Sequence, residues 1–313
     1  MGKKLNYIMK HTFKVTLLLA MIFFVAQIVG LAITKEYIST EEYIDPETKA
    51  VVKKVISGDL PYNLERPEIE QSTSYIWITI AVIIGTLLLL LIIRFKKMSL
   101  WKLWFFFAVF FTIAIAFAPF VGQVIAAIIS FIFALMKIYR PTAAFNNFTE
   151  IFIYGGLAAI FVPIINVFAA FALLFLISIY DIIAVRYTKH MVKLAKFQAK
   201  SKIFAGLLLP YGKGKGIAAE GKGIIQDKEK GRIAVLGGGD IGFPLLFAGA
   251  VMKELILTNP EPIGFLKTLI IPVFVTLALL YLLIKGEKDK FYPAMPYLAV
   301  GCVVGYFAVL LLF

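Results

Sequence analysis

The most prominent pattern in the sequence is a series of long apolar runs separated by short polar segments. A helix that spans a bilayer needs about 20 mostly apolar residues, and nine runs approach that length. They lie at 14–34, 75–93, 101–118, 120–138, 151–164, 166–187, 233–254, 263–284 and 291–313. The third and fourth runs are divided at Ala118-Pro119, because proline ends helices. The pattern therefore predicts an all-α polytopic membrane protein with about nine spans.

The basic residues predict which ends of these spans face the cytoplasm. Loops rich in lysine and arginine are retained on the cytoplasmic side. With the N-terminus inside, nine spans place 25 of the 32 lysines and arginines in cytoplasmic segments and 7 outside. Merging two spans would put the basic loop at 186–232 outside. We therefore expect a multi-pass protein of the cell membrane with a cytoplasmic N-terminus and an external C-terminus.

The spans and loops predict one integrated membrane domain in three parts. Residues 1–200 form a six-helix scaffold, 201–232 a basic, glycine-rich cytoplasmic loop, and 233–313 a three-helix C-terminal part. The chain is 61% hydrophobic and 16% charged, so its net charge of +13 indicates topology, and no nucleic acid is expected as a partner. One cysteine and two histidines leave little for a disulfide framework or a metal site.

Two acidic residues differ from the others because they lie deep within predicted spans. Of the 19 acidic residues, 17 lie in loops or within about one turn of a span end, and the exceptions are Asp181 and Asp240. A charge at the centre of a membrane helix costs about 2.5–3.5 kcal/mol on insertion scales. The pair could be structural, could conduct protons or cations, or could share a proton as the acid and base of a protease. The placement of the acids leaves all three interpretations open, with an ion or proton conduit as the main alternative to a protease.

Glycines beside Asp240 indicate a helix that begins loosely at this point. Gly237, Gly238 and Gly239 precede it, and each glycine costs about 1 kcal/mol in a helix interior. A loosened start exposes backbone groups and admits water, which a protease needs in order to attack an unwound substrate. The preceding run at 232–236 is β-prone and could pair with such a substrate. Transporters also break helices, so the glycines support a protease without deciding for it.

Three short motifs resemble those of the presenilin and signal peptide peptidase family. They are Tyr180-Asp181, which resembles its YD motif, Gly237-Gly238-Gly239-Asp240, which resembles GxGD, and Pro293-Ala294-Met295-Pro296, which resembles PAL. Met295 replaces the leucine of PAL, a change that keeps volume and polarity. The order of the motifs, the nine spans and the basic loop between the sixth and seventh spans also match. The resemblance therefore covers essentially the whole chain.

This resemblance implies an intramembrane aspartyl endopeptidase that needs no cofactor. Asp181 and Asp240 would be the catalytic pair and would activate one water, with the roles of acid and base unassigned. We expect the Tyr180 hydroxyl to form a hydrogen bond near the site. The other motif residues would shape the site or bind substrate: Gly237, Gly238, Gly239, Pro293, Ala294 and Met295.

The resemblance also implies the partners and origin of the protein. Transmembrane segments of substrate proteins and the lipid bilayer are the expected partners, and no obligate subunit is implied. The predicted orientation is that of presenilins, whereas signal peptide peptidases are inverted. The length of 313 residues and the sequence end at Phe313 are typical of a compact prokaryotic, archaeal-type homologue.

Overall fold

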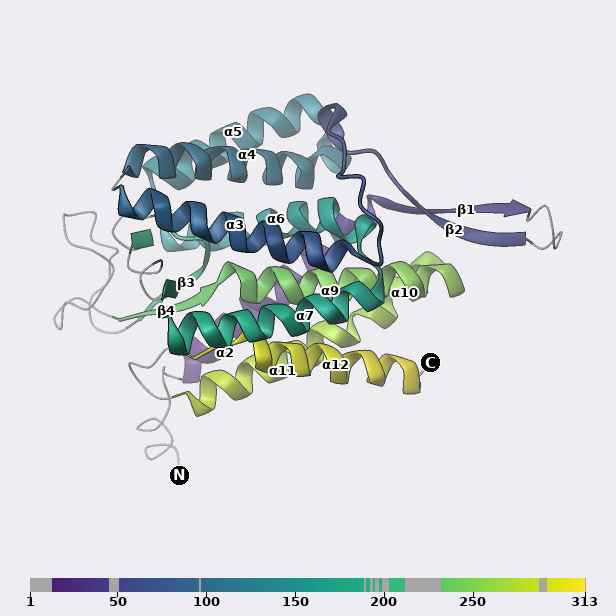
Figure 1. The fold of residues 1–313 in the computed structure, drawn as a ribbon. Coiled ribbons are helices and arrows are strands. Elements are labelled where there is room, and N and C mark those ends of the chain that lie inside the picture. The colour runs from purple at the N-terminus through teal and green to yellow at the C-terminus, as the bar shows by residue number, and fades with distance from the viewer. Residues whose placement is uncertain are drawn as a thin grey trace.

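The computed structural model of the protein is a bundle of long helices with two small hairpins (Figure 1). It describes residues 13–44, 51–95, 97–188, 190–191, 194, 197–198, 203–211, 232–286 and 292–312. The α-helices are α2 (Phe13–Lys35), α3 (Ser74–Arg94), α4 (Met98–Val121), α5 (Gln123–Tyr139), α6 (Ala143–Phe161), α7 (Val167–Ile182), α9 (Gly238–Thr258), α10 (Glu261–Thr268), α11 (Ile270–Lys285) and α12 (Met295–Leu312).

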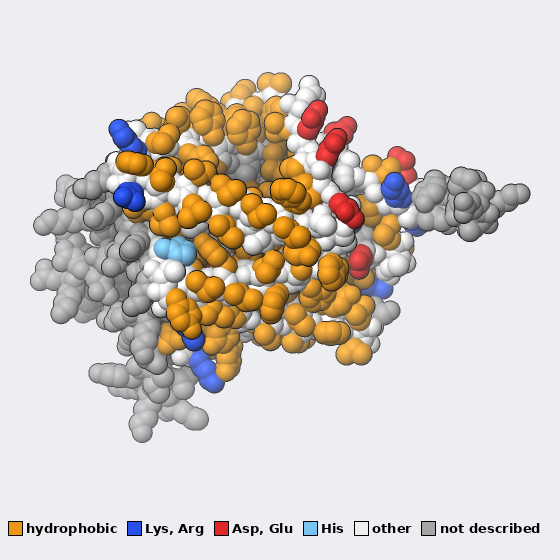
Figure 2. All heavy atoms as spheres, viewed as in Figure 1, with side chains coloured by type: hydrophobic (Ala, Val, Ile, Leu, Met, Phe, Trp, Pro, Cys, Tyr) orange, Lys and Arg blue, Asp and Glu red, His pale blue; other side chains and the backbone are white. Residues whose placement is uncertain are grey.

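The predicted set of spans is confirmed within the described residues. Eight helical segments are long and apolar enough to cross a membrane when α10 and α11 are counted together, and the shorter α5 is the ninth. Figure 2 shows apolar side chains across the visible face of the bundle, with acidic side chains gathered at the end where β1 and β2 project. Exposed apolar side chains of this kind are what a hydrocarbon environment requires. The direction in which the spans cross the membrane stays a prediction.

The sequence predicted a break between the third and fourth spans at Pro119, but the structure places this break later in the chain. Helix α4 continues through Pro119 to Val121, and Gly122 with a φ of 80° separates it from α5. A proline in a helix leaves the carbonyl four residues earlier without its usual donor. Here that carbonyl belongs to Ile115, and the Tyr37 hydroxyl donates to it at 2.6 Å. The substitute donor stabilises the proline within the helix.

The fifth span begins earlier than predicted, at Ala143 and not at 151. The Thr142 side chain caps the helix by accepting from the Phe145 amide at 3.3 Å. Glu150 therefore lies within α6 and is only 1% exposed. The expectation that only two acidic residues lie deep within spans is wrong. A 3₁₀ turn, Val162–Ile164, ends this crossing.

Two antiparallel hairpins lie at opposite ends of the bundle (Figure 1). One consists of β1 (Ile38–Ile44) and β2 (Val51–Ser57), and the other of β3 (Gly206–Tyr211) and β4 (Arg232–Gly237). The seventh span consequently begins at Gly238 and not at 233. The predicted cytoplasmic loop contains strand β3, while residues 212–231 lie outside the described part of the chain. The division of the domain into three parts stays a prediction.

Helix α2 is half buried and contacts α6, α9 and α11. Leu19 and Phe23 on this helix are fully buried in the main hydrophobic cluster. The Gln27 side chain donates to the Ile241 carbonyl at 2.9 Å. This bond connects α2 to the first turn of α9, where Asp240 lies.

Candidate active site

Asp181 lies near the end of α7 and is 4% exposed. Asn166 fixes the beginning of this helix by accepting from the Ala169 amide at 2.7 Å. Directly after Asp181, the helix widens into a π-helical turn at Ile183–Tyr187. Such turns interrupt regular helices and are frequent at functional sites.

The PAL-like motif supplies a hydrogen-bond donor to Asp181. The Met295 amide donates to its Oδ2 at 3.1 Å, and the Ala294 amide lies close enough to favour the charged carboxylate. Met295 begins α12, so its N–H is one of the amides that a helix leaves unpaired at its start. The positive end of the helix dipole also favours a carboxylate there. Pro293 is buried in the segment that leads to this helix.

Asp240 lies in the first turn of α9, where strand β4 becomes a helix. The Gly237 amide lies close enough to act on its carboxyl group, and a Cβ at Gly237 would lie 3.3 Å from Oδ2. Helices α7 and α9 are in contact, and Asp181 lies near enough to Asp240 for its negative charge to act on that carboxyl group. Neither forms an ion pair in the described residues. The structure thus brings the YD, GxGD and PAL-like motifs together.

The hydroxyl of Tyr180 points to another region. Its oxygen lies 3.0 Å from Thr86 Oγ1 on α3 and 3.0 Å from His190 Nε2. These contacts contradict the expectation of a hydrogen bond beside the carboxyl groups. Adjacent positions on a helix face different directions, so Asp181 can point inward while Tyr180 joins α7 to α3. Any role of Tyr180 would act through the position of α7.

Strands β3 and β4 form a small sheet directly before the GxGD segment. Gly206 pairs with Gly237, and Leu208 with Val235. Gly206 has a φ of 138°, and a Cβ there would overlap the Leu236 carbonyl. Glycine is therefore required at this position.

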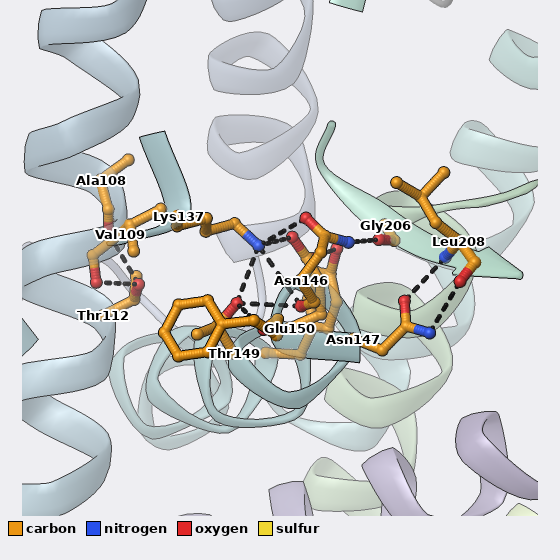
Figure 3. Close-up of polar contacts among 12 residues, drawn as sticks. Ala108, Val109, Thr112, Lys137, Asn146, Asn147, Thr149, Glu150, Gly206 and Leu208 are labelled. Carbon is orange, nitrogen blue, oxygen red and sulfur yellow. Dashed lines mark hydrogen bonds and ion pairs between the residues drawn. The ribbon is translucent and has the colours of Figure 1, made fainter. Parts of the chain in front are cut away.

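A buried polar network beside the sheet was not predicted from the sequence (Figure 3). Lys137 on α5 is 2% exposed, and its Nζ lies 2.7 Å from Glu150 Oε1. The same ammonium donates to Asn146 Oδ1 and Thr149 Oγ1, both at 2.9 Å. The second oxygen of Glu150 accepts from the Tyr154 hydroxyl. A helix start at Pro141-Thr142 is the sequence signal that could have placed Glu150 inside a span.

Comparison with known proteins identifies the family. A family model described as signal-peptide peptidase, presenilin aspartyl protease matches residues 50–313. The chain belongs to this family. It is accordingly an aspartic endopeptidase of the intramembrane kind, as the resemblance of its motifs predicted. The prokaryotic origin stays a prediction.

Solved structures show the same fold for this aspartyl protease. Two are described as structures of a presenilin family intramembrane aspartate protease, in the C222 and P2 space groups. The first has a TM-score of 0.60 and 16% identity and covers 95% of this chain and 99% of that chain. The second has a TM-score of 0.56 and 16% identity and covers 94% and 97%. A search of curated protein sequences returns no match.

Proposed function

We propose that this protease hydrolyses peptide bonds within transmembrane segments of other membrane proteins, with Asp181 and Asp240 as the catalytic pair. The observation that carries the proposal is two carboxyl groups on contacting helices, near enough for the charge of one to act on the other, without an ion-paired cation in the described residues. Two nearby carboxylates do not both ionise easily, so they share one proton. A pair of this kind contains both a base and an acid for attack on an amide.

The reaction needs one water and no cofactor. One carboxylate takes a proton from the water as its oxygen attacks the carbonyl carbon of the substrate. The protonated carboxyl gives its proton to the carbonyl oxygen, which produces a tetrahedral diol. As the diol collapses, the carboxyl group that took the water proton gives it to the amide nitrogen, and the other carboxylate takes a proton from a diol hydroxyl. The C–N bond breaks, and both carboxyl groups return to their starting protonation states. The Met295 amide orients the Asp181 carboxyl group throughout.

An unwound substrate segment is best held by strand β4. The outer edge of β3 is occupied, because the Asn147 side chain donates to the Leu208 carbonyl and accepts from its amide, both at 2.8 Å. In the described residues β4 pairs only with β3, so its other edge is available for strand addition. A substrate strand there would pass beside Gly239, which is exposed, and would reach Asp240.

The partners and orientation follow from this function. Substrate spans and the bilayer are the proposed partners. We propose a cytoplasmic N-terminus in the cell membrane, because most basic residues then lie inside. Labelling of single cysteines in the β1–β2 hairpin of a Cys302→Ala variant, from outside intact cells, checks this orientation. Labelling only after permeabilisation would invert it.

The decisive experiment is cleavage in reconstituted vesicles. The purified protein is mixed with a single-span substrate and compared with Asp181→Ala and Asp240→Ala. We expect each substitution to abolish cleavage, and Gly85→Ala, which meets only open space on α3, to leave it intact. Proton or cation flux that depends on either acid, with no cleavage of a panel of substrates, would instead support a conduit.

A dependence on pH provides a second test of the shared proton. A pair that works as one base and one acid is active only in its singly protonated form. The cleavage rate should therefore pass through a maximum as pH rises and fall on both sides. A rate that is constant between about pH 4 and 8 would contradict a shared proton.

A further inference from the structure

The polar network in Figure 3 reaches the GxGD segment through Tyr154. Tyr154 is 4% exposed and projects from α6, and its hydroxyl donates to Glu150. The end of its ring lies against α9 at Gly238. A Cβ at Gly238 would overlap the Tyr154 hydroxyl and would lie 3.1 Å from Cζ. One turn later, a Cβ at Gly242 would lie 3.7 Å from the same ring. The ring thus covers the glycine face of the first turn of α9.

Contacts other than the one with Tyr154 hold Glu150 in place. Its other oxygen is paired with Lys137, whose ammonium is also held by Asn146 and Thr149. A buried charge with this many partners has little freedom to move. The position of the Tyr154 hydroxyl is therefore set by α5 and α6, outside the two helices that carry the aspartates.

The same network also binds strand β3, which pairs with β4, the strand that leads into α9. Asn146 accepts from Lys137 and donates to the Gly206 carbonyl at 2.7 Å. Gly206 pairs with Gly237, which is adjacent to Gly238 in the chain. The network is consequently linked to both sides of the turn that carries Asp240. It reaches the strand side indirectly, through Asn146 and Gly206, and the helix side directly, through Tyr154.

From this geometry we infer that Tyr154, held by Glu150 and Lys137, is a positioning residue for Asp240. The ring end fills the space that the absent side chain of Gly238 leaves, and so determines where the first turn of α9 lies. The inference rests on the proposed catalytic role of Asp240. Misplacement of a catalytic group by about 1 Å can reduce the rate on the order of 100-fold.

A double-mutant cycle between Tyr154 and Gly238 tests the inference. We expect Gly238→Ala to lower kcat by about 10-fold to 100-fold with little change in KM, because its methyl group pushes α9 away from the hydroxyl. Tyr154→Phe removes the overlapping oxygen but frees the ring from Glu150, and should lower kcat by a few-fold. The double variant should then be more active than Gly238→Ala alone, since the overlapping oxygen is gone and the remaining 3.1 Å contact with Cζ requires a much smaller shift.

The controls separate positioning from general damage. Tyr306→Phe also removes a tyrosine hydroxyl, from a ring that packs on Phe171 and Phe247. This substitution should leave kcat unchanged. Gly85→Ala controls for the glycine substitution. If Gly238→Ala does not fold, recovery of the folded protein by Tyr154→Phe is the corresponding measurement, and failure to recover would contradict the inference.

Two results would contradict the positioning role of Tyr154. One is that the substitutions at Tyr154 and Gly238 affect kcat independently, and the other is that they change only KM. Asp240→Asn is measured in the same series. If it retains cleavage, the proposed function fails, and the cycle is then read from thermal unfolding. If it abolishes cleavage while the cycle is additive, only the role of Tyr154 fails.

Discussion

Glu150 and Asp240 are both acidic side chains within the helix bundle, but their neighbours differ in kind. Glu150 is paired with Lys137 at 2.7 Å and accepts from Tyr154, so its charge is neutralised and its oxygens have partners. Asp240 lies within the electrostatic influence of another acid, Asp181, and forms no ion pair in the described residues. The first arrangement favours one fixed protonation state. The second keeps a proton exchangeable, which is the property that acid–base chemistry needs.

The largest expected effect is a separation of activity from stability at the aspartates. The double variant Asp181→Asn/Asp240→Asn should lose cleavage by more than about 100-fold, because both proton-transfer groups are gone. Its unfolding temperature should not fall, since two neighbouring acids are replaced by neutral amides of similar shape. Activity in vesicles and thermal unfolding in detergent check the two parts. A large loss of stability would show that the pair is structural.

The opposite separation is expected at the ion pair. Lys137→Met leaves Glu150 buried without a cation, and breaking a buried pair costs about 3–5 kcal/mol. The unfolding temperature should therefore fall markedly. The variant Lys137→Met/Glu150→Gln should recover most of the loss, because a neutral amide can still accept from Tyr154. Equal losses in the single and double variants would mean that the charge pairing is unimportant for folding.

The difference between the two acids also explains what the sequence could reveal. Asp181 and Asp240 lie in long apolar runs, and Asp240 also adjoins glycines that disrupt helices. Residues of that kind are visible along the chain. The partnership of Glu150 with Lys137 depends on how α6 packs on α5, and no spacing along the chain reports it.

Other errors of prediction have the same origin in tertiary contacts. Pro119 continues a helix because Tyr37, far away in sequence, satisfies the freed Ile115 carbonyl. The hydroxyl of Tyr180 turns to Thr86 because α3 packs beside α7. Local propensity indicates that a helix should end or that a side chain should be near a motif. Partners from other helices decide the outcome.

Lys253 is another buried charged residue, and its contacts resemble those of Glu150 more than those of Asp240. It lies in α9, and its Nζ donates to the carbonyls of Pro163 at 3.2 Å and Ile165 at 2.6 Å, at the break between α6 and α7. Gln71 is a further partner at 3.1 Å. Lys253→Met should destabilise the protein by about 1–3 kcal/mol, because these carbonyls lose their donor.

The measurement for Lys253 is again thermal unfolding, together with the kcat of the protein that remains folded. Lys253→Arg, which retains the charge and several donors, is the matched variant and should lose less. The kcat of Lys253→Met should stay close to that of the parent. A fall in kcat comparable with that of an aspartate variant would place Lys253 in the catalytic machinery and would contradict the comparison.

The smallest expected effect concerns the residue that departs from the PAL motif. Met295 holds Asp181 through its backbone amide, and its side chain is 3% exposed in the core. Met295→Leu keeps the amide and nearly the same volume, so the change in stability should be below about 1.5 kcal/mol and kcat should stay within a few-fold. Met295→Pro would instead remove the donor, and a large loss of kcat is expected there alone. If Met295→Leu changes kcat as much as Met295→Pro, then the side chain and not the amide controls the Asp181 carboxyl group.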